Sequence, residues 1–135
     1  METGEQNKMT IKVENKAENL EQGITNLIDC ASLDYMNWSR DINYKLAHDN
    51  TKLDNQVAEF KNNFEVNQGK KYIKVINKGV FCFIVTNDFE KNGKTFKKGD
   101  ILKAASWATP ALNKSRGNVL IGNYPIEWTG PQYLR

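Results

Sequence analysis

The stretch 100–118 holds the residues best suited to binding an anion or acting in catalysis: Lys103, Ser106, Arg116 and Asn118. A lysine and an arginine bind anions, and a serine becomes a nucleophile when a base lies beside it. No base stands at a suitable spacing from Ser106, and the chain has no paired carboxylates suited to acid–base work. The single histidine, His48, has no partner motif nearby. The sequence therefore predicts that the protein is not an enzyme.

The cysteines, Cys30 and Cys82, are the remaining candidates for a reactive or metal-binding group. Cys30 falls in an apolar helical pattern and Cys82 in the pattern of a central strand. Neither has a second cysteine or a histidine at a ligand spacing. Buried thiols of this kind are mostly packing groups. We therefore expect no metal site and no cofactor.

Charge is distributed unevenly along the chain. Residues 1–66 carry seven Lys or Arg against twelve Asp or Glu, a net charge of −5, whereas residues 67–135 carry twelve against four, a net charge of +8. Such asymmetry is typical of proteins whose basic part contacts nucleic acid or whose acidic part binds a partner. The alternative is that the two parts neutralise each other within one fold.

The basic part interleaves lysines with aromatic residues, a composition that suits backbone charge and base stacking on nucleic acid. It has no Gly-rich phosphate loop, no Cys/His finger and no RNA-recognition aromatic motif, so the predicted binding is not specific for sequence. The alternative is that the aromatics form a β-domain core and the lysines a solvated rim. The predicted phosphate contacts are Lys74, Lys94, Lys97, Lys98, Lys103 and Arg116, with Tyr72 or Trp107 stacking on bases.

The acidic part has the apolar periodicity of helices. Apolar residues recur every three or four positions over 17–31, and Ser32 and Asp34 are suitable N-caps for a second helix over 34–63. An unbroken second helix would be ~45 Å long, more than a small domain covers. It therefore either breaks near Asp49-Asn50 or presents its outer part to a partner. Its stripe is typical of core packing, and it also suits a homo-oligomer or a host or phage protein bound through residues 34–64.

One glycine interrupts the first helical pattern. Gly23 lies within 17–31, where a glycine weakens a helix by ~1 kcal/mol relative to alanine without ending it.

The basic part has the alternating pattern of an antiparallel sheet. The tight turn Lys78-Gly79 joins two of its strands, and the second of these, VFCFIVT, is apolar on both faces and so belongs in the middle of the sheet. Short connections favour antiparallel neighbours. Strands are predicted over 70–77, 80–86 and 100–105, with a C-terminal pair at 118–121 and 126–128.

A short capped helix is predicted at 110–116. Thr109 suits the N-cap, Pro110 the first helical position and Gly117 a left-handed residue at the end. Arg116 then either pairs with an acid such as Asp100 or Glu127, or contacts an anion.

The predicted fold class is α+β, with two N-terminal helices packed on a small antiparallel β-meander. One compact domain would comprise a flexible N-terminus (1–16), an acidic helical region (17–66) and a basic β-rich region (67–135). The alternation at Ile11 and Val13 allows an edge strand instead of a flexible segment.

Several segments of the basic part resemble a known family: KYIKV, FCFIV, ILKAASW followed by Pro-Ala, RGN and the C-terminal WTGPQYLR. Together they resemble a widespread family of small uncharacterised bacteriophage proteins, over about half the chain, from Gly69 to Arg135. The resemblance implies a phage protein and no particular activity. Family members often carry lysines where this chain has Ala108 and Leu112, so phosphate contacts are not expected at those positions.

Two functions then remain open. The first is a phage accessory protein that binds nucleic acid non-specifically. The second is a protein-binding phage factor, either an inhibitor of a host enzyme or defence component or a minor virion component, acting through the acidic helices. No apolar run approaches the ~20 residues that span a bilayer, and the N-terminus METGEQNKMT lacks the features of a signal peptide. We therefore expect a protein of the host cytoplasm without membrane contact.

Overall fold

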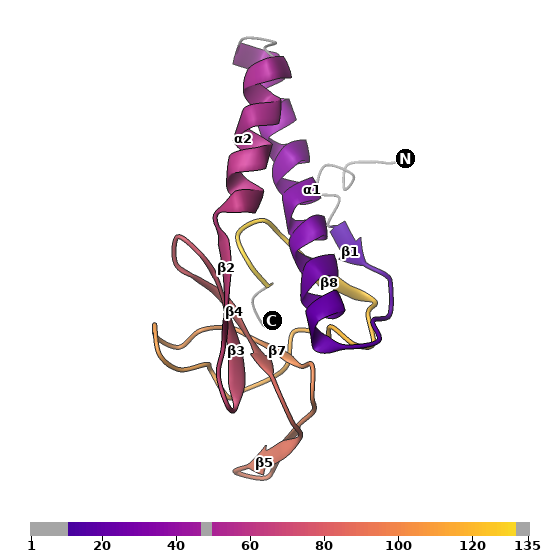
Figure 1. The fold of residues 1–135 in the computed structure, drawn as a ribbon, viewed down its shortest axis with the longest axis vertical. Helices are drawn as coiled ribbons and strands as arrows, with labels where there is room; N and C mark the ends of the chain where they lie inside the picture. Colours follow the sequence, from indigo (N-terminus) through magenta and orange to yellow (C-terminus); the bar gives the residue numbers. More distant parts are fainter. Residues whose placement is uncertain (1–10, 47–49, 132–135) are drawn as a thin grey trace.

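The computed structural model describes residues 11–46 and 50–131. Two helices, α1 (Leu20–Leu46) and α2 (Asn50–Asn62), run side by side and rise above a group of short strands (Figure 1). The fold class is α+β, as predicted. The strands are β1 (Ile11–Val13), β2 (Phe64–Gln68), β3 (Tyr72–Asn77), β4 (Val80–Val85), β5 (Phe89–Lys91), β6 (Lys94–Phe96), β7 (Ile101–Leu102) and β8 (Tyr124–Ile126).

The main sheet is an antiparallel meander in the order β2-β3-β4-β7. The sequence VFCFIV of β4 lies between β3 and β7, as its two apolar faces predict. Lys78 has a positive φ of 67° in the turn between β3 and β4. Two further antiparallel pairs, β1-β8 and β5-β6, stand apart from the main sheet.

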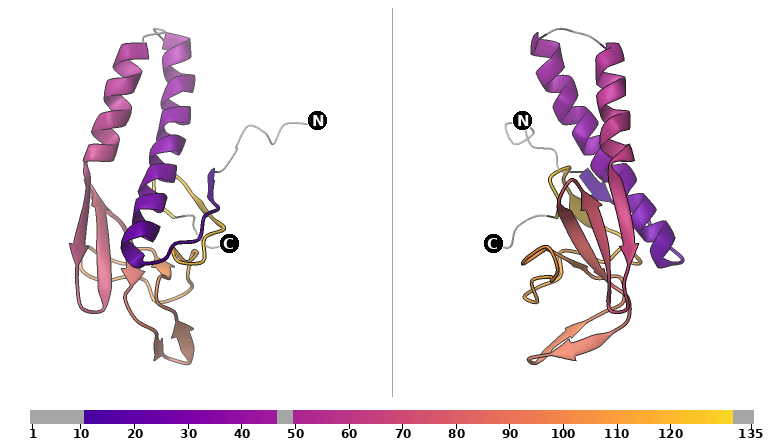
Figure 2. Two further views of the ribbon diagram at one scale, coloured as in Figure 1. Left: turned by 45° about the vertical axis from the view of Figure 1, so that its right-hand side comes forward. Right: turned by 60° about the vertical axis from the view of Figure 1, so that its left-hand side comes forward.

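Each face of the main sheet has its own apolar cluster. One face packs against α1, where Leu27 and Ala31 are fully buried with Val75, Cys82 and Ile84. Figure 2 shows α1 crossing beside this sheet, with β1 next to the N-terminal part of the helix. The opposite face carries a smaller cluster, formed by Phe83, Val85, Phe96 and Leu102. Among the described residues, no helix is long and apolar enough to span a membrane.

The predicted boundary between two helices at Ser32 and Asp34 is wrong, because α1 runs through both residues. The Ser32 hydroxyl donates to the Ile28 carbonyl 2.8 Å away inside the helix, and the Asp34 carboxylate accepts a hydrogen bond from the backbone of Trp128. Neither side chain therefore caps a helix. Of the two alternatives for the long helix, the break near Asp49-Asn50 agrees with the structure, since α1 ends at Leu46 and α2 begins at Asn50.

The predicted helical region to residue 66 is too long, because the chain passes from α2 into β2 at Phe64. Asn77, the partner of Phe64 in the sheet, donates its side-chain N–H to the Phe60 carbonyl at 3.0 Å. The same carbonyl, in the last turn of α2, accepts the Asn63 N–H at 3.3 Å, so Asn77 gives it a second donor from the sheet. The tertiary structure therefore decides where the helix ends.

The predicted capped helix at 110–116 is wrong. The chain instead folds back on itself: Ala105 N–H donates to the Thr109 carbonyl at 2.9 Å and Ala111 N–H donates to the Lys103 carbonyl at 2.7 Å. The Thr109 hydroxyl lies 2.9 Å from the Ser106 hydroxyl, so it is not a helix cap. The predicted strand over 100–105 is correspondingly reduced to β7, with isolated bridges at either side of it.

The residues after this loop lie along the outer edge of β7. Ile101 N–H donates to the Gly117 carbonyl and Arg116 N–H donates to the Ile101 carbonyl, both at 2.8 Å. This pairing keeps the chain extended and competes with a helix at 110–116. It also places Asn118 opposite Asp100 rather than in a C-terminal strand.

The predicted C-terminal strand pair is also wrong. Residues 118–121 form a bridge and a turn, and β8 pairs with β1 instead. Val13 is fully buried by this pairing, so residues 11–13 form the edge strand that was the alternative to a flexible segment. Of the rest of the predicted flexible N-terminus, residues 14–16 belong to no helix or strand, and residues 1–10 lie outside the described residues.

Candidate nucleic-acid interface

The face of the sheet that points away from α1 carries two of the predicted site residues. Ile73 and Val75 of β3 pack toward α1, so strand alternation places Tyr72 and Lys74 on the opposite face. Lys74 pairs with Phe83 of β4, and Phe83 pairs with Leu102 of β7. We call this surface, with the segments 86–99 and 103–116 that border it, the basic face.

The structure brings Lys74 and Trp107 together. The Lys74 ammonium lies 4.3 Å from the centroid of the Trp107 ring and 5.9 Å from that of Phe83. Trp107 reaches this position because the loop 103–111 folds back over the sheet. Trp107 is 59% exposed, and among the large hydrophobic residues of the described chain only Ile121 is more exposed. The ammonium and the indole form a cation–π contact whose outer surface faces solvent.

A second contact between a lysine and aromatic rings lies at the start of β3. The Lys71 ammonium lies 4.3 Å from the Phe89 ring centroid and 5.9 Å from that of Tyr72. Tyr72 makes edge contacts with Phe83 and Phe89, and burial raises the pKa of its phenol. Lys71 was not among the predicted site residues. Its position next to Tyr72 at the entry to an alternating strand was the signal that could have identified it.

Lys94 and Arg116 meet at Asn113. The Lys94 ammonium donates to the Asn113 backbone carbonyl at 3.1 Å, and the Arg116 guanidinium donates to the Asn113 side-chain oxygen at 3.3 Å and to the Lys114 carbonyl at 3.0 Å. Leu112, the residue before Asn113, packs on the second apolar cluster. Lys94, Lys114 and Arg116 therefore gather at the border of the basic face.

Arg116 does not form either of the predicted ion pairs among the described residues. The Asp100 carboxylate instead accepts hydrogen bonds from the Lys97 backbone at 2.8 Å and from the Asn118 amide at 2.9 Å. Burial lowers the pKa of the Arg116 guanidinium, and its Nε is buried without a hydrogen-bond partner. Of the two predicted roles, the ion pair is wrong and the anion contact stays a prediction.

Lys97 and Lys98 lie beside a carboxylate. The Lys97 ammonium is 3.8 Å from the Asp88 carboxylate, and the Lys98 backbone N–H donates to the same carboxylate at 2.7 Å. Both lysines are exposed. The charge that they present to a phosphate is therefore partly offset by Asp88.

Lys103 points elsewhere. Its ammonium donates to the Pro131 carbonyl at 2.9 Å, in the C-terminal segment. Burial lowers the pKa of this ammonium, and the nearby Arg116 charge lowers it further, against opposing effects of Cys82 and Glu127. The structure thus separates Lys103 from the aromatic residues that Lys71 and Lys74 contact.

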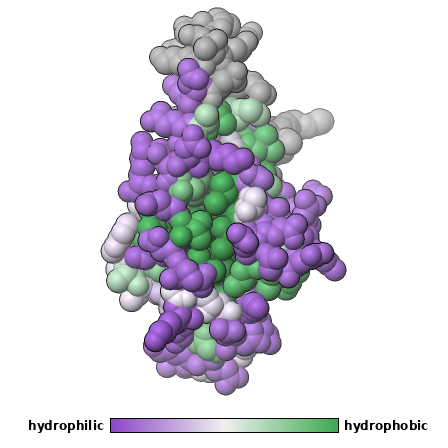
Figure 3. Space-filling model, viewed as in Figure 1, coloured by the Kyte–Doolittle hydropathy of each residue, from purple (hydrophilic) through white to green (hydrophobic). Residues whose placement is uncertain are grey.

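A groove of about 520 Å³ lies on another part of the molecule, where the helices, the β3–β4 turn and the C-terminal segment meet. Its aromatic residues are Tyr35 of α1, Phe60 of α2, Phe81 of β4 and Trp128. Tyr35 stacks on Phe60 with centroids 4.4 Å apart, and Trp128 meets Tyr35 edge-on at 5.3 Å. Figure 3 shows hydrophobic residues gathered where the helices meet the sheet, framed by hydrophilic ones.

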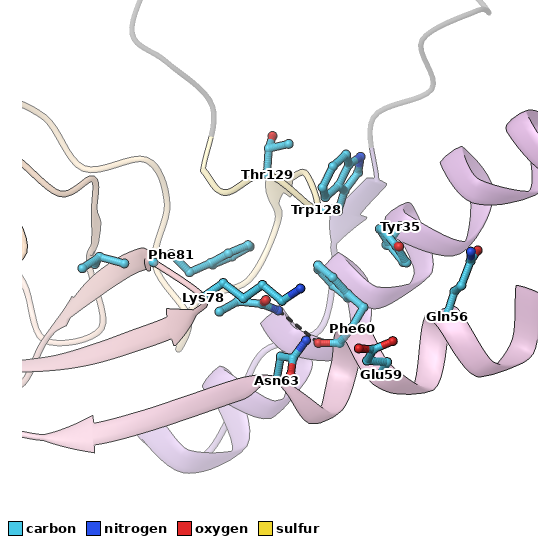
Figure 4. A pocket seen from close by; sticks show the side chains of 12 residues that line it. Tyr35, Gln56, Glu59, Phe60, Asn63, Lys78, Phe81, Trp128 and Thr129 are labelled. Atoms are coloured by element: carbon cyan, nitrogen blue, oxygen red, sulfur yellow. Dashed lines mark hydrogen bonds between the residues drawn. The ribbon is translucent and has the colours of Figure 1, made fainter.

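The groove has polar residues on two sides. In Figure 4, Lys78 extends from the β3–β4 turn toward Phe60, and Glu59 lies on the α2 side. Trp38, which packs against Trp128 with centroids 4.9 Å apart, is 47% exposed beside the groove. Tyr35, Trp38 and Phe60 belong to the apolar stripe that was predicted for the helix over 34–63, but no pattern in the sequence brings Trp128 to them.

No cluster of three or more His, Cys, Asp or Glu side chains suited to a metal ion occurs in the described ranges. Comparison of the chain with protein families, curated proteins and solved structures found no match.

Proposed function

We propose that the protein binds nucleic acid non-specifically through the basic face, as a phage accessory protein of the host cytoplasm. The contact between Lys74 and the exposed Trp107 carries this proposal. An exposed indole gives a stacking surface that any base can use, and an adjacent ammonium gives charge for the following phosphate. Lys71 with Tyr72 and Phe89 repeats the combination on the same face.

The basic cluster around Asn113 extends the surface. Lys94 of β6 comes to the segment that carries Lys114 and Arg116, so three cationic residues meet at this part of the border. The Lys94 ammonium and the Arg116 guanidinium donate to neutral oxygens, so those contacts do not cancel their charge.

The test is a titration of the purified protein with a fluorescent single strand of about 20 nucleotides, followed by anisotropy between about 50 and 200 mM salt. We expect binding that weakens steeply with salt. Trp107→Ala should weaken binding by ~1 to 3 kcal/mol without changing the salt slope, because it removes stacking and no charge. Lys74→Gln and Lys94→Gln should each reduce the slope of log affinity against log salt by ~0.7.

Two control variants distinguish binding through the basic face from a general effect of charge or apolar surface. Lys78→Gln removes a cation at the groove, and Ile121→Ala shortens another exposed apolar side chain, 62% exposed, outside the basic face. Both should bind like the parent. Absence of binding at the lowest salt, or equal losses in Lys74→Gln and Lys78→Gln, would overturn the proposal.

A protein-binding phage factor is the second candidate, and the aromatic groove favours it. A volume of about 520 Å³ holds one or two side chains of a partner, and the half-exposed Trp38 extends the apolar surface along α1. Three carboxylates lie in or near the groove, those of Glu59, Asp34 and Glu127, against the one ammonium of Lys78. The partner segment that fits best therefore has an apolar anchor flanked by basic residues.

To test this candidate, the chain is immobilised, a host protein is captured on it, and that protein is then purified. Direct binding measured by calorimetry should be lost in Trp38→Ser and retained in Trp107→Ala. Binding that survives Trp38→Ser, or that fails with the purified protein, would remove the groove from consideration.

A further inference from the structure

The main sheet has one covered edge and one open edge. Along β7 the segment 116–119 supplies hydrogen-bond partners: the Gly117 carbonyl accepts the Ile101 N–H, and the Val119 N–H donates to the Gly99 carbonyl just before the strand. Strand β2 is the other edge, and its described residues after Phe64 are all exposed. No described segment covers β2 on the side away from β3.

The direction of the β2 backbone groups follows from the strand register. Gly69 N–H donates to the Tyr72 carbonyl at 3.0 Å, which makes these two residues a hydrogen-bonded pair. In an antiparallel ladder such pairs alternate, so Glu65 and Asn67 direct their N–H and C=O groups toward β3. Val66, between them, directs its own groups outward. An outward N–H and C=O at Val66 form a template for another strand.

Edge strands that remain single usually carry features that block pairing, such as lysine, proline or a bulge. The sequence FEVNQ of β2 contains neither lysine nor proline. The bulge-like irregularity of the main sheet lies in the β3–β4 pair and not in β2. Val66 instead leaves an apolar β-branched side chain 47% exposed in the middle of the strand. Apart from the charge of Glu65, the edge therefore has none of these protecting features.

We propose that β2 pairs with β2 of a second copy of the chain, antiparallel, with the two-fold axis at Val66. This register places Val66 opposite Val66 of the second copy in a hydrogen-bonded pair, and Phe64 opposite Gln68. It also places Glu65 opposite Asn67. A register centred on Glu65 would set two carboxylates directly against each other, which is unfavourable.

Such a dimer would extend the main sheet through both copies. A two-fold axis perpendicular to the sheet leaves the basic faces on the same side, with the two β3 strands ~14 Å apart at three strand spacings. A nucleic acid would then meet Lys74 and Trp107 of both copies. This consequence rests on the proposed function, whereas the dimer itself does not.

The oligomeric state is tested without nucleic acid, by sedimentation of the full chain over a concentration series. A five-residue strand pair is a small interface, so we expect a concentration-dependent dimer in the micromolar range. Val66→Lys and Val66→Pro should raise the dissociation constant about tenfold or more, since one adds a charged side chain at the axis and the other removes the outward N–H. Val66→Thr, which keeps the β-branch and the N–H, should dimerise like the parent.

Cross-linking tests the register. Residues of a hydrogen-bonded antiparallel pair have Cα atoms ~5.5 Å apart, within disulfide range. Val66→Cys should form a covalent dimer on mild oxidation, whereas Asn67→Cys should not, because its side chain meets Glu65 and points to the other face. A chain that is monomeric at every concentration, or a dimer that Val66→Lys and Val66→Pro leave intact, would overturn the proposal.

Discussion

The Asp34 carboxylate accepts a hydrogen bond from the backbone N–H of Trp128 at 2.9 Å, joining the middle of α1 to the C-terminal segment. This contact holds Trp128 against Tyr35 and Trp38 and so forms one wall of the groove. Partial burial raises the pKa of Asp34, the nearby Glu127 raises it further, and the Trp128 N–H opposes both.

Asp34→Asn should remove a pH dependence of the free energy of unfolding and keep the hydrogen bond from the Trp128 N–H. Because the pKa of Asp34 is raised on folding, the folded state binds more protons, and the free energy of unfolding falls as the pH rises from about 3.8 through the folded value. The asparagine oxygen still accepts the Trp128 N–H and carries no charge to desolvate. We expect this fall to disappear in urea unfolding between about pH 3.5 and 7.

Asp34→Ala is the matched comparison at pH 7. It leaves the Trp128 N–H without its acceptor, so it should lower the free energy of unfolding by about 1 kcal/mol or more, while Asp34→Asn should be at least as stable as the parent. Equal losses in the two variants would show that the hydrogen bond is not what Asp34 contributes.

Gly23→Ala should destabilise the protein, although helix propensity alone predicts a gain of ~1 kcal/mol. A Cβ at Gly23 would lie 2.7 Å from the Val119 carbonyl oxygen and 2.8 Å from the Val119 Cβ, so α1 would have to move away from the 116–119 segment. Thermal melts should show a loss of ~1 to 3 kcal/mol. Thr25→Ala, at an exposed position of the same helix, is the control and should be neutral or stabilising.

Gly117→Ala should cost ~1 to 3 kcal/mol for two reasons that act together. Gly117 has a φ of +146°, and a Cβ there would lie 2.5 Å from the Cβ of Tyr124. The predicted loss thus comes from strain and close approach rather than from a helix cap. At Gly79 a Cβ would meet nothing within 4 Å, so Gly79→Ala should change stability by less than ~0.5 kcal/mol. Equal melts of the Gly117 and Gly79 variants would contradict this account.

The two thiols should differ in reactivity. Burial strongly raises the pKa of Cys82, while burial and then Asp29 and Glu14 raise the pKa of the half-buried Cys30. A raised pKa leaves less thiolate, which is the reactive form. In a native-state thiol titration only Cys30 should react, slowly, and both should react in denaturant. Cys30→Ser should leave no reactive thiol, and rapid labelling of that variant would show that the sheet opens.

Asp88→Asn should strengthen nucleic-acid binding if the proposed function is right. The change removes the charge 3.8 Å from the Lys97 ammonium and keeps an oxygen for the Lys98 N–H. We expect an affinity gain of about twofold at low salt and a steeper salt dependence. Glu21→Gln, an equal charge change at an exposed position in the first turn of α1, is the control for net charge. The same gain in both variants would mean that Lys97 and Lys98 make no phosphate contact.

Strands β3 and β4 of the main sheet could be predicted because their signals are local, whereas β2 begins inside the predicted helical region. The turn at Lys78-Gly79 and the two apolar faces of VFCFIV specify adjacent antiparallel strands and a central position, and these depend only on nearby residues. The break between α1 and α2 near Asp49-Asn50 was one of two alternatives for the same reason. Turn chemistry and side-chain periodicity act before any distant contact forms.

The predictions that failed depended on competition with distant partners. Thr109, Pro110 and Gly117 have the local signature of a capped helix, yet backbone pairing of Arg116 and Gly117 with Ile101 keeps the chain extended. Asp34 has the signature of an N-cap, yet its carboxylate bonds to Trp128. A weak local preference loses to a hydrogen bond formed across the fold, because such preferences rarely exceed ~1 kcal/mol.

By itself the sequence determined that this is an α+β chain with an acidic helical part and a basic sheet, because periodicity and charge can be read residue by residue. Only the tertiary structure decided that Lys74 lies over Trp107, that Trp128 closes a groove with Tyr35, and that β1 pairs with β8. Each of these joins residues far apart in the chain. Such pairs are chosen by packing and backbone hydrogen bonding of the whole fold, and no local pattern encodes them.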